Sequence, residues 1–211
     1  MRHKEVFGNK SLLEAWGQYA VKAYFPSLTS NEKILEVGAG TGINVSKLKD
    51  LAKVEVVEPS QIARDHCLEI GIEAYEKIEN LPEPARYDRI LLRHVLEYVQ
   101  NPRDFILNLS GHLKENGHII IILPCENTYK SIDENEMDYH LYCWNQQTIH
   151  NLIMDCLLIP TNANLHYFNG RRLMYPLLRF IGMGAYSRVI YILGRLTNSS
   201  EIVIHASLKK N

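Results

Sequence analysis

Short apolar runs alternate with longer amphipathic stretches along most of the chain. Strands are predicted where four to eight mostly apolar residues lie between polar or turn residues. These runs are Lys33–Gly38, Lys53–Glu58, Ile72–Tyr75, Tyr87–Leu92, His118–Leu123, Asn164–Phe168 and Glu201–Leu208. Apolar residues at helical spacing, together with helix-start and helix-stop signals, predict helices between them. The predicted helices are Ser11–Phe25 before Pro26, Asn44–Leu51, one opening at Pro59-Ser60, Pro102–Glu115 and Asn145–Leu157.

This alternation of strands and helices predicts an α/β fold with a doubly wound, mostly parallel sheet of seven strands. The run His118–Leu123 is the most apolar, so we expect it at the centre of the sheet, covered on both faces. We expect one domain over 1–211, with an N-terminal helical segment at 1–29. In such sheets ligands bind beyond the carboxyl ends of the strands, where the strand order reverses.

A helical cap is predicted at 170–199, inserted between the last two strands. Helical spacing extends over Arg171–Ile181 and Ala185–Leu196, with a break at Gly182-Met-Gly184. Each predicted helix carries an apolar stripe and two arginines seven residues apart. Three roles stay open for 171–196: a lid over the acceptor pocket, a homodimer surface, or a helix on an anionic membrane with its arginines toward the head groups.

Composition and charge narrow the class of protein. Hydrophobic residues make up 46% and charged residues 22% of the 211, which excludes disordered and collagen-like chains. Residues 156–211 hold seven Lys and Arg and one acid, Glu201, whereas the rest of the chain is acidic. This asymmetry indicates an anionic partner for the C-terminal part or a lid that balances the acidic body. With no signal-peptide pattern and no run long enough to span a bilayer, we expect a cytoplasmic protein with possible peripheral membrane contact.

A glycine-rich segment follows the first predicted strand, in the sequence Glu36-Val-Gly-Ala-Gly-Thr-Gly42. Alternate glycines let the backbone turn sharply and approach a ligand closely. Glu58 ends the second strand sixteen residues later, where a carboxylate can accept hydrogen bonds from both ribose hydroxyls of an adenosine. The dinucleotide fingerprint GxGxxG is not met, because Ile43 holds its third glycine position, and no P-loop lysine follows.

With this loop and Glu58, the pairs Tyr87-Asp88 and Leu96-Glu97 and the segment Leu113–Gly117 before a strand ending in Pro124 resemble the class I S-adenosylmethionine-dependent methyltransferases. The resemblance covers about residues 30–160. It is closest to the small-molecule branch that includes the ubiquinone-biosynthesis methyltransferases. It implies S-adenosylmethionine as cofactor and S-adenosylhomocysteine as product.

The resemblance also implies a role for each matching position. Gly38, Ala39, Gly40 and Gly42 would face the methionine part of the cofactor. Glu36 would support the loop or the amino group of that part. Glu58 would hold the ribose and Pro59 would lie against the adenine. Lys77 and Ile78 fall where the family places an acid and a backbone amide toward the adenine, so Glu76 or Glu79 would have to substitute for that acid. Arg93 would bind the methionine carboxylate or an anionic acceptor.

Methyl transfer from a sulfonium needs alignment and exclusion of water, and it needs a general base only where the acceptor loses a proton. Two histidines are candidates for that base. His94 follows the fourth strand, and His140 precedes a helix beside aromatic residues that could wall an organic acceptor: Tyr139, Tyr142 and Trp144. The alternatives are that His140 orders its loop while the aromatic residues belong to the core, and that Arg93 or His94 faces solvent or caps a helix. After the fourth strand the family has a histidine where this chain has Tyr98.

No metal site is expected, since the histidines and the four cysteines lack ligand spacing, and Cys125 is interpreted as part of the pocket wall. The leading hypothesis is an S-adenosylmethionine-dependent methyltransferase acting on a small, anionic or lipid-linked molecule, at oxygen. An RNA methyltransferase is a rival, although no basic stripe with interleaved aromatics favours nucleic acid. A non-catalytic cofactor-binding or assembly protein on the same fold is the other rival.

Overall fold

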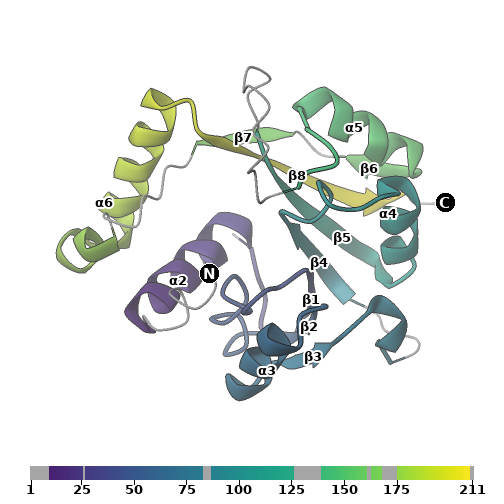
Figure 1. The fold of residues 1–211 in the computed structure, drawn as a ribbon, viewed down its shortest axis with the longest axis horizontal. Coiled ribbons are helices and arrows are strands. Elements are labelled where there is room, and N and C mark those ends of the chain that lie inside the picture. The colour runs from purple at the N-terminus through teal and green to yellow at the C-terminus, as the bar shows by residue number, and fades with distance from the viewer. Residues whose placement is uncertain are drawn as a thin grey trace.

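A computed structural model describes residues 10–25, 27–82, 87–125, 139–160, 163–167 and 175–209, without the side chains of 10–16, 175–180 and 183. One eight-stranded sheet forms its centre (Figure 1). The strands are β1 (Lys33–Val37), β2 (Lys53–Val57), β3 (Glu73–Tyr75), β4 (Tyr87–Arg93), β5 (Leu113–Pro124), β6 (Leu158–Pro160), β7 (Asn164–Tyr167) and β8 (Ser200–Leu208). The helices are α2 (Lys10–Tyr24), α3 (Gln61–Glu69), α4 (Pro102–Ser110), α5 (Gln146–Asp155), α6 (Tyr175–Leu196) and the short 3-10 helix η1 (Ile78–Asn80).

The strand order is β3-β2-β1-β4-β5-β8-β6, and β7 also pairs with β8. Strand β1 pairs in parallel with both β2 and β4, so the chain order reverses between them. The sheet is parallel from β3 to β5, and β8 then adds antiparallel to β5. The prediction of a doubly wound, mostly parallel α/β sheet is therefore confirmed, and the reversal places a crevice at the carboxyl ends of β1 and β4.

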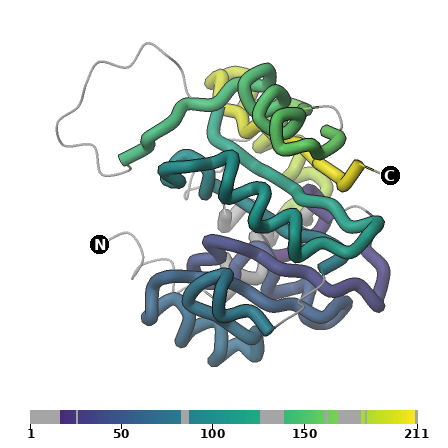
Figure 2. The backbone as a smooth tube through the Cα atoms, turned by 90° about the vertical axis from the view of Figure 1, so that its right-hand side faces the viewer, coloured from purple at the N-terminus to yellow at the C-terminus, as the bar shows by residue number. Residues whose placement is uncertain are grey.

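Helices cover the two faces of the sheet, and each face has its own apolar core. On one face α4 and α5 pack against residues such as Leu35, Ile90 and Ile121. On the other face α2 and α3 pack against Ile34, Leu91 and their neighbours. Figure 2 shows the early part of the chain, with α2 and α3, at one end of the molecule and β8 with α5 at the other. The alternation of side chains along each strand thus divides the core into two layers.

The sheet has eight strands where seven were predicted. The sequence prediction missed β6. Two short strands, β6 and β7, pair with different parts of β8, where the prediction placed a single strand. Pro160 of β6 pairs with Ala206, and Asn164 of β7 pairs with Val203 of the same strand β8. The predicted last residue of β7, Phe168, lies outside the described residues.

One predicted helix is absent from the structure, and another is shorter than predicted. The segment Asn44–Leu51 is a series of turns, in which the N–H of Val45 and of Leu48 each donate to the carbonyl three residues earlier. Asparagine and valine have low helix propensities, so Asn44 and Val45 disfavour a helix at the start of this segment. The helix predicted to reach Glu115 ends at Ser110, because the chain from Leu113 onward already pairs with β4.

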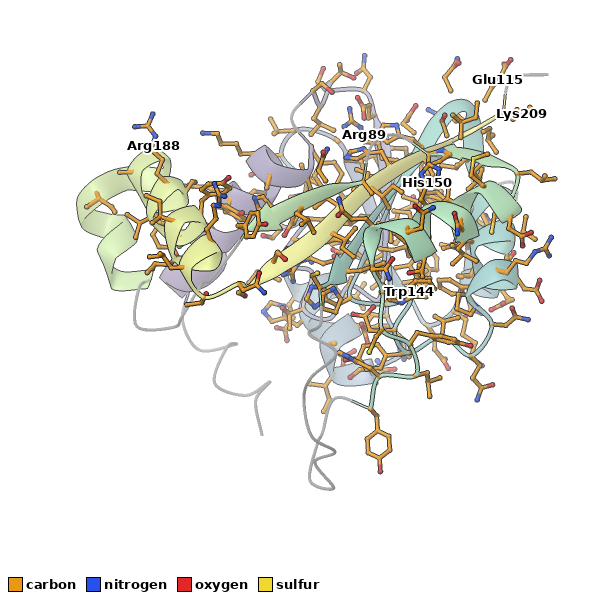
Figure 3. The ribbon with its side chains drawn as sticks, turned by 90° about the horizontal axis from the view of Figure 1, so that it is seen from above. Arg89, Glu115, Trp144, His150, Arg188 and Lys209 are labelled. Carbon is orange, nitrogen blue, oxygen red and sulfur yellow. The ribbon has the colours of Figure 1, made fainter. Side chains whose placement is uncertain are left out.

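The predicted break in the cap is confirmed at Gly182, whose φ of 72° and ψ of 166° interrupt α6. Residues 170–174 of the cap and 1–9 of the N-terminal segment lie outside the described residues. Tyr186 and Ile190 of α6 are buried against Tyr19 of α2, whereas Arg188 points away from the sheet (Figure 3). In the part of the chain that the structure describes, no helix is both long and apolar enough to cross a membrane.

Candidate functional site

The glycine loop leaves β1 at the crevice between β1 and β4. Gly38, Gly40 and Gly42 all have left-handed backbones, with φ of 72°, 53° and 69°. The N–H of Gly38 donates to the carbonyl of Val57 at 2.8 Å, which ties the loop to the end of β2. A Cβ at Gly38 would lie 2.6 Å from Val95 Cγ2, but a Cβ at Gly40 would meet nothing within 4 Å. Gly38 is therefore glycine for packing, whereas Gly40 faces open space that a ligand can approach.

Glu58 lies opposite this loop, just after β2. Its Oε2 accepts a hydrogen bond from the N–H of Gly40 at 2.7 Å, and its Oε1 accepts one from the N–H of Ser60 at 2.8 Å. The two bonds fix the carboxylate beside the glycine loop. A carboxylate has about four acceptor positions, so both oxygens can still accept from a ligand hydroxyl.

Glu36 is a buried carboxyl beneath the loop. Its Oε1 accepts from Asn44 Nδ2 at 2.6 Å, and within the described ranges its buried Oε2 has no hydrogen-bond partner. Burial raises the pKa of Glu36 to about 8, against the opposing effects of Asn44 and Arg93. Buried polar atoms in folded proteins are nearly always paired, so this oxygen is suited to a ligand that donates a hydrogen bond or carries a positive charge.

A pocket of about 400 Å³ opens beside the loop, within the size range of small-molecule and cofactor sites. Several residues predicted to contact the cofactor or the acceptor line it: Gly38, Pro59, Lys77, Ile78 and His94. Glu76 and Glu79, the two possible substitutes for the missing acid, also line it. Phe105 and Asn108 of α4 complete its wall and were not predicted, because nothing in the sequence of α4 distinguishes its pocket-facing side.

Arg93 ends β4, and its side chain forms hydrogen bonds with Glu201 and Tyr24. Its Nη2 donates to Glu201 Oε1 at 2.6 Å and its Nε to the Tyr24 hydroxyl at 3.2 Å. Burial raises the pKa of Glu201, but Arg93 and then His94 outweigh it and hold that pKa at about 2. The same carboxylate raises the pKa of Arg93. Whether Arg93 also reaches the methionine carboxylate stays a prediction.

The two candidate bases lie in different surroundings. His94 has a φ of 54°, and its Nε2 lies 2.9 Å from Glu201 Oε1. His140 Nε2 lies 3.0 Å from the hydroxyl of Tyr98, which lines the pocket. Sequence reasoning missed Glu201 and Tyr24. The available signal for Glu201 was that it is the single acid in residues 156–211.

The aromatic residues near His140 do not form one wall. The Tyr142 and Trp144 rings lie 5.7 Å apart, but Tyr139 is 82% exposed. Cys125 forms an isolated bridge with Trp144 and donates its N–H to the carbonyl of Ser200. Among the described residues, no three His, Cys, Asp or Glu side chains are grouped as metal ligands.

A glycine loop and an acid at the switch point of a doubly wound sheet define a nucleoside-cofactor-binding α/β protein. Residues 13–171, about three quarters of the chain, match the family model of the methyltransferase domain. The chain therefore belongs to the class I S-adenosylmethionine-dependent methyltransferases. The family and the cofactor predicted from the sequence are both confirmed.

One relative is a ubiquinone biosynthesis O-methyltransferase from Rickettsia felis, 32% identical over 100 residues, which are 44% of this chain and 41% of that one. The chain thus spans about two fifths of the length of this curated relative. Among solved structures, a SAM-dependent methyltransferase from Aquifex aeolicus has a TM-score of 0.62 at 15% identity and covers 97% of this chain and 96% of its own. The [4+2]-cyclase SpnF also has a TM-score of 0.62, at 13% identity, and covers 92% of this chain and 80% of its own. The fold alone therefore does not determine the reaction.

Proposed function

We propose that this chain transfers the methyl group of S-adenosylmethionine to an oxygen of a small-molecule acceptor. The observation that carries the proposal is that the glycine loop, Glu58 and the 400 Å³ pocket lie together at the carboxyl edge of β1, β2 and β4. The O-methyltransferases among the relatives support oxygen as the atom that is methylated.

The residues present fit the cofactor. Glu58 would accept hydrogen bonds from the ribose hydroxyls, and the pocket beside Pro59 and Ile78 would hold the adenine. The open space in front of Gly40 would admit the methionine part. Beside the positively charged amino group of the methionine part Glu36 would ionise, and its Oε2 would then accept from that group, either directly or through a water.

When bound, the cofactor supplies a methyl group already activated by a positively charged sulfur. The chain then has to hold an acceptor in line and keep water away. For an acceptor hydroxyl the chain must also remove a proton, and His94 and His140 are the candidate bases. His94 lines the pocket itself, whereas His140 reaches it through Tyr98.

The cap supports a small-molecule site, and of its three candidate roles we propose the lid. Tyr186 and Ile190 pack on Tyr19, and Ile43, which directly follows Gly42, packs against the same cluster. The cap is therefore joined to the glycine loop. Its exposed side still carries Tyr191, Ile192 and Leu196 with Arg188, so an anionic or lipid-linked acceptor at its edge is part of the proposal.

Calorimetric titration with S-adenosylmethionine, S-adenosylhomocysteine and NAD in parallel tests the cofactor site. We expect micromolar-range binding of the first two and none of NAD. Transfer of a tritiated methyl group is then measured to phenols, carboxylic acids, amines and RNA, with small organic acceptors offered with and without an alkyl chain. Label on a hydroxyl or carboxylate oxygen supports the proposal. Label on RNA, or tight cofactor binding with no transfer to any acceptor, contradicts it.

A further inference from the structure

We propose that Glu201 is a positioning residue that holds the His94 imidazole with Nδ1 ready to accept the proton of the acceptor. The inference deepens the proposed function and rests on it for the identity of the reaction. The two residues lie 107 positions apart in the chain. They meet where β4 ends and β8 begins.

The Glu201 carboxylate is fixed from three directions. Its Oε1 accepts from Arg93 Nη2 at 2.6 Å and lies 2.9 Å from His94 Nε2. Its Oε2 accepts from the Tyr24 hydroxyl at 3.3 Å. Only 8% of the Glu201 side chain is exposed, and the Arg93 guanidinium balances its charge. A buried, charge-balanced carboxylate of this kind cannot relax toward solvent, so it sets the orientation of the ring that it binds.

The main chain also fixes the position of His94. Its φ of 54° lies in the left-handed region, which is uncommon for a residue other than glycine. The N–H of His94 donates to the carbonyl of Ile122 at 2.9 Å. The next residue, Val95, packs against Gly38 of the glycine loop. Strained backbones persist where the surroundings enforce them, and they cluster at functional sites.

The hydrogen bond to Glu201 determines which ring nitrogen can act as a base. An ionised carboxylate only accepts hydrogen bonds, so the neutral imidazole carries its hydrogen on Nε2. The lone pair is then on Nδ1, which has no hydrogen-bond partner in the described part of the chain. His94 lines the pocket, and its side chain is 37% exposed, so the ring is accessible from the site.

A hydroxyl acceptor must lose its proton when it is methylated. The acceptor oxygen forms a bond to the methyl carbon as the carbon–sulfur bond of S-adenosylmethionine breaks, and the electron pair of that bond stays on sulfur. The hydroxyl proton passes to His94 Nδ1. The resulting imidazolium is stabilised by the Glu201 carboxylate that it contacts.

Other ionisable groups surround this pair. From the sheet and helix side these are Arg93, Glu36, Tyr24, Tyr19 and His166. From the pocket side they are Glu76, Lys77, Glu79 and Tyr98. Glu201 is the one of these groups that forms a hydrogen bond with the His94 ring, so its charge is the one that a test should remove.

The test is nitrogen NMR of the cofactor-free full chain labelled with ¹⁵N-histidine, with the His94 signals assigned from His94→Gln. In the wild type we expect hydrogen on Nε2 and none on Nδ1. In Glu201→Gln the amide oxygen can still accept from Nε2, but the negative charge is lost. The hydrogen bond from Nε2 is then weaker, so the fraction of His94 rings that carry the hydrogen on Nε2 should fall. With an acceptor found in the methyl-transfer assay, kcat of Glu201→Gln should be lower than that of the wild type by roughly tenfold or more. Its affinity for S-adenosylhomocysteine should stay within about twofold.

Glu32→Gln is the matched control, because it removes an equally paired carboxylate from the far edge of the sheet and should leave His94 unchanged. Tyr24→Phe removes the donor to Glu201 Oε2 and the acceptor of the Arg93 Nε hydrogen bond but keeps the Glu201 charge, so it should give a smaller change. That variant decides the question if Glu201→Gln does not fold. An unchanged fraction of hydrogen on Nε2 in the folded variants, or hydrogen on Nδ1 in the wild type, overturns the proposal. A wild type that binds no cofactor instead overturns the proposed function, and the His94 spectra then decide the positioning role alone.

Discussion

Charged side chains are buried at both ends of the parallel strands, here called the amino-terminal edge and the carboxyl edge of the sheet. The two edges use these side chains differently. At the amino-terminal edge Arg89 donates to both oxygens of Glu32 and to the carbonyl of Ser27. Nearby, Asp88 accepts from the N–H of Lys33 and from Lys114 Nζ, both at 2.7 Å. Hydrogen bonds led by the one from Arg89 outweigh burial and hold the pKa of Glu32 below its ordinary value. The groups at this edge satisfy one another.

The carboxyl edge is less complete. Gly38, Gly40 and His94 have left-handed backbones there, and Glu36 keeps a buried oxygen without a partner among the described residues. The pocket opens at the same place. The comparison teaches that a buried ion pair alone does not indicate a site. Backbone strain, an unsatisfied buried atom and a cavity that coincide do indicate one.

The strongest test of the comparison is Arg89→Met. The substitution leaves the half-buried Glu32 without its cation, so we expect the free energy of unfolding to fall by about 3 kcal/mol. The affinity for S-adenosylhomocysteine should not change, since the pocket lies at the other edge. Urea unfolding and calorimetry measure the two quantities. Arg103→Met breaks the exposed pair with Asp155 and should cost far less stability. A folded Arg89→Met chain that has lost cofactor binding would break the comparison.

Gly40→Val tests the opposite edge. A branched side chain would enter the open space in front of the loop from a left-handed backbone, so we expect binding of S-adenosylmethionine to weaken by roughly 100-fold or more. Gly71→Val is the matched control. Gly71 also has a positive φ, 80°, and a Cβ there would meet only Lys49 Nζ at 3.9 Å. Both variants carry the backbone strain. If calorimetry shows equal cofactor affinity in the two, the loop assignment is wrong.

Local sequence signals predicted most of the fold and the position of the glycine loop. The glycine loop, Glu58 and the break at Gly182 each depend on a few consecutive residues or on the end of one strand. Such features are readable because backbone conformation and strand ends are set locally. Positions that depend on strand pairing could not be predicted from local sequence signals. Leu113 extends helical spacing in the sequence, yet it pairs with Tyr87 in the sheet.

The cluster of Tyr24, Arg93, His94 and Glu201 shows why part of the site was missed. Its members come from α2, β4 and β8, and the antiparallel pairing of β8 with β5 sets Glu201 opposite Pro124. That register depends on which strands are neighbours, and apolar spacing does not contain this information. His94 could be predicted as a candidate because it follows a strand. The carboxylate that orients it could be found only in three dimensions.

Glu58→Ala gives a smaller effect at the carboxyl edge. The variant removes the proposed acceptor of the ribose hydroxyls and the acceptor of the Gly40 N–H, so we expect cofactor binding to weaken by about 1–3 kcal/mol. Glu58→Gln should lie between the variant and the wild type, because one oxygen can still accept from Gly40. Glu69→Ala, an exposed acid at the end of α3, should have no effect in the same titration. An unaltered dissociation constant in Glu58→Ala would remove the ribose role.

The smallest effect is a pH dependence at the amino-terminal edge. Burial, then Arg89 and His205, lower the pKa of His118 from 6.5 to about 4. Between these values the unfolded chain binds a proton that the folded chain does not, so stability must fall as the pH drops from 6.5 toward 4. Allowing for solvent screening, we expect about 1 kcal/mol from this group. Urea unfolding at pH 7 and pH 5 should therefore show a weaker pH dependence in His118→Gln than in the wild type or in His112→Gln. Equal pH dependence in all three would mean that folding does not lower the pKa of His118.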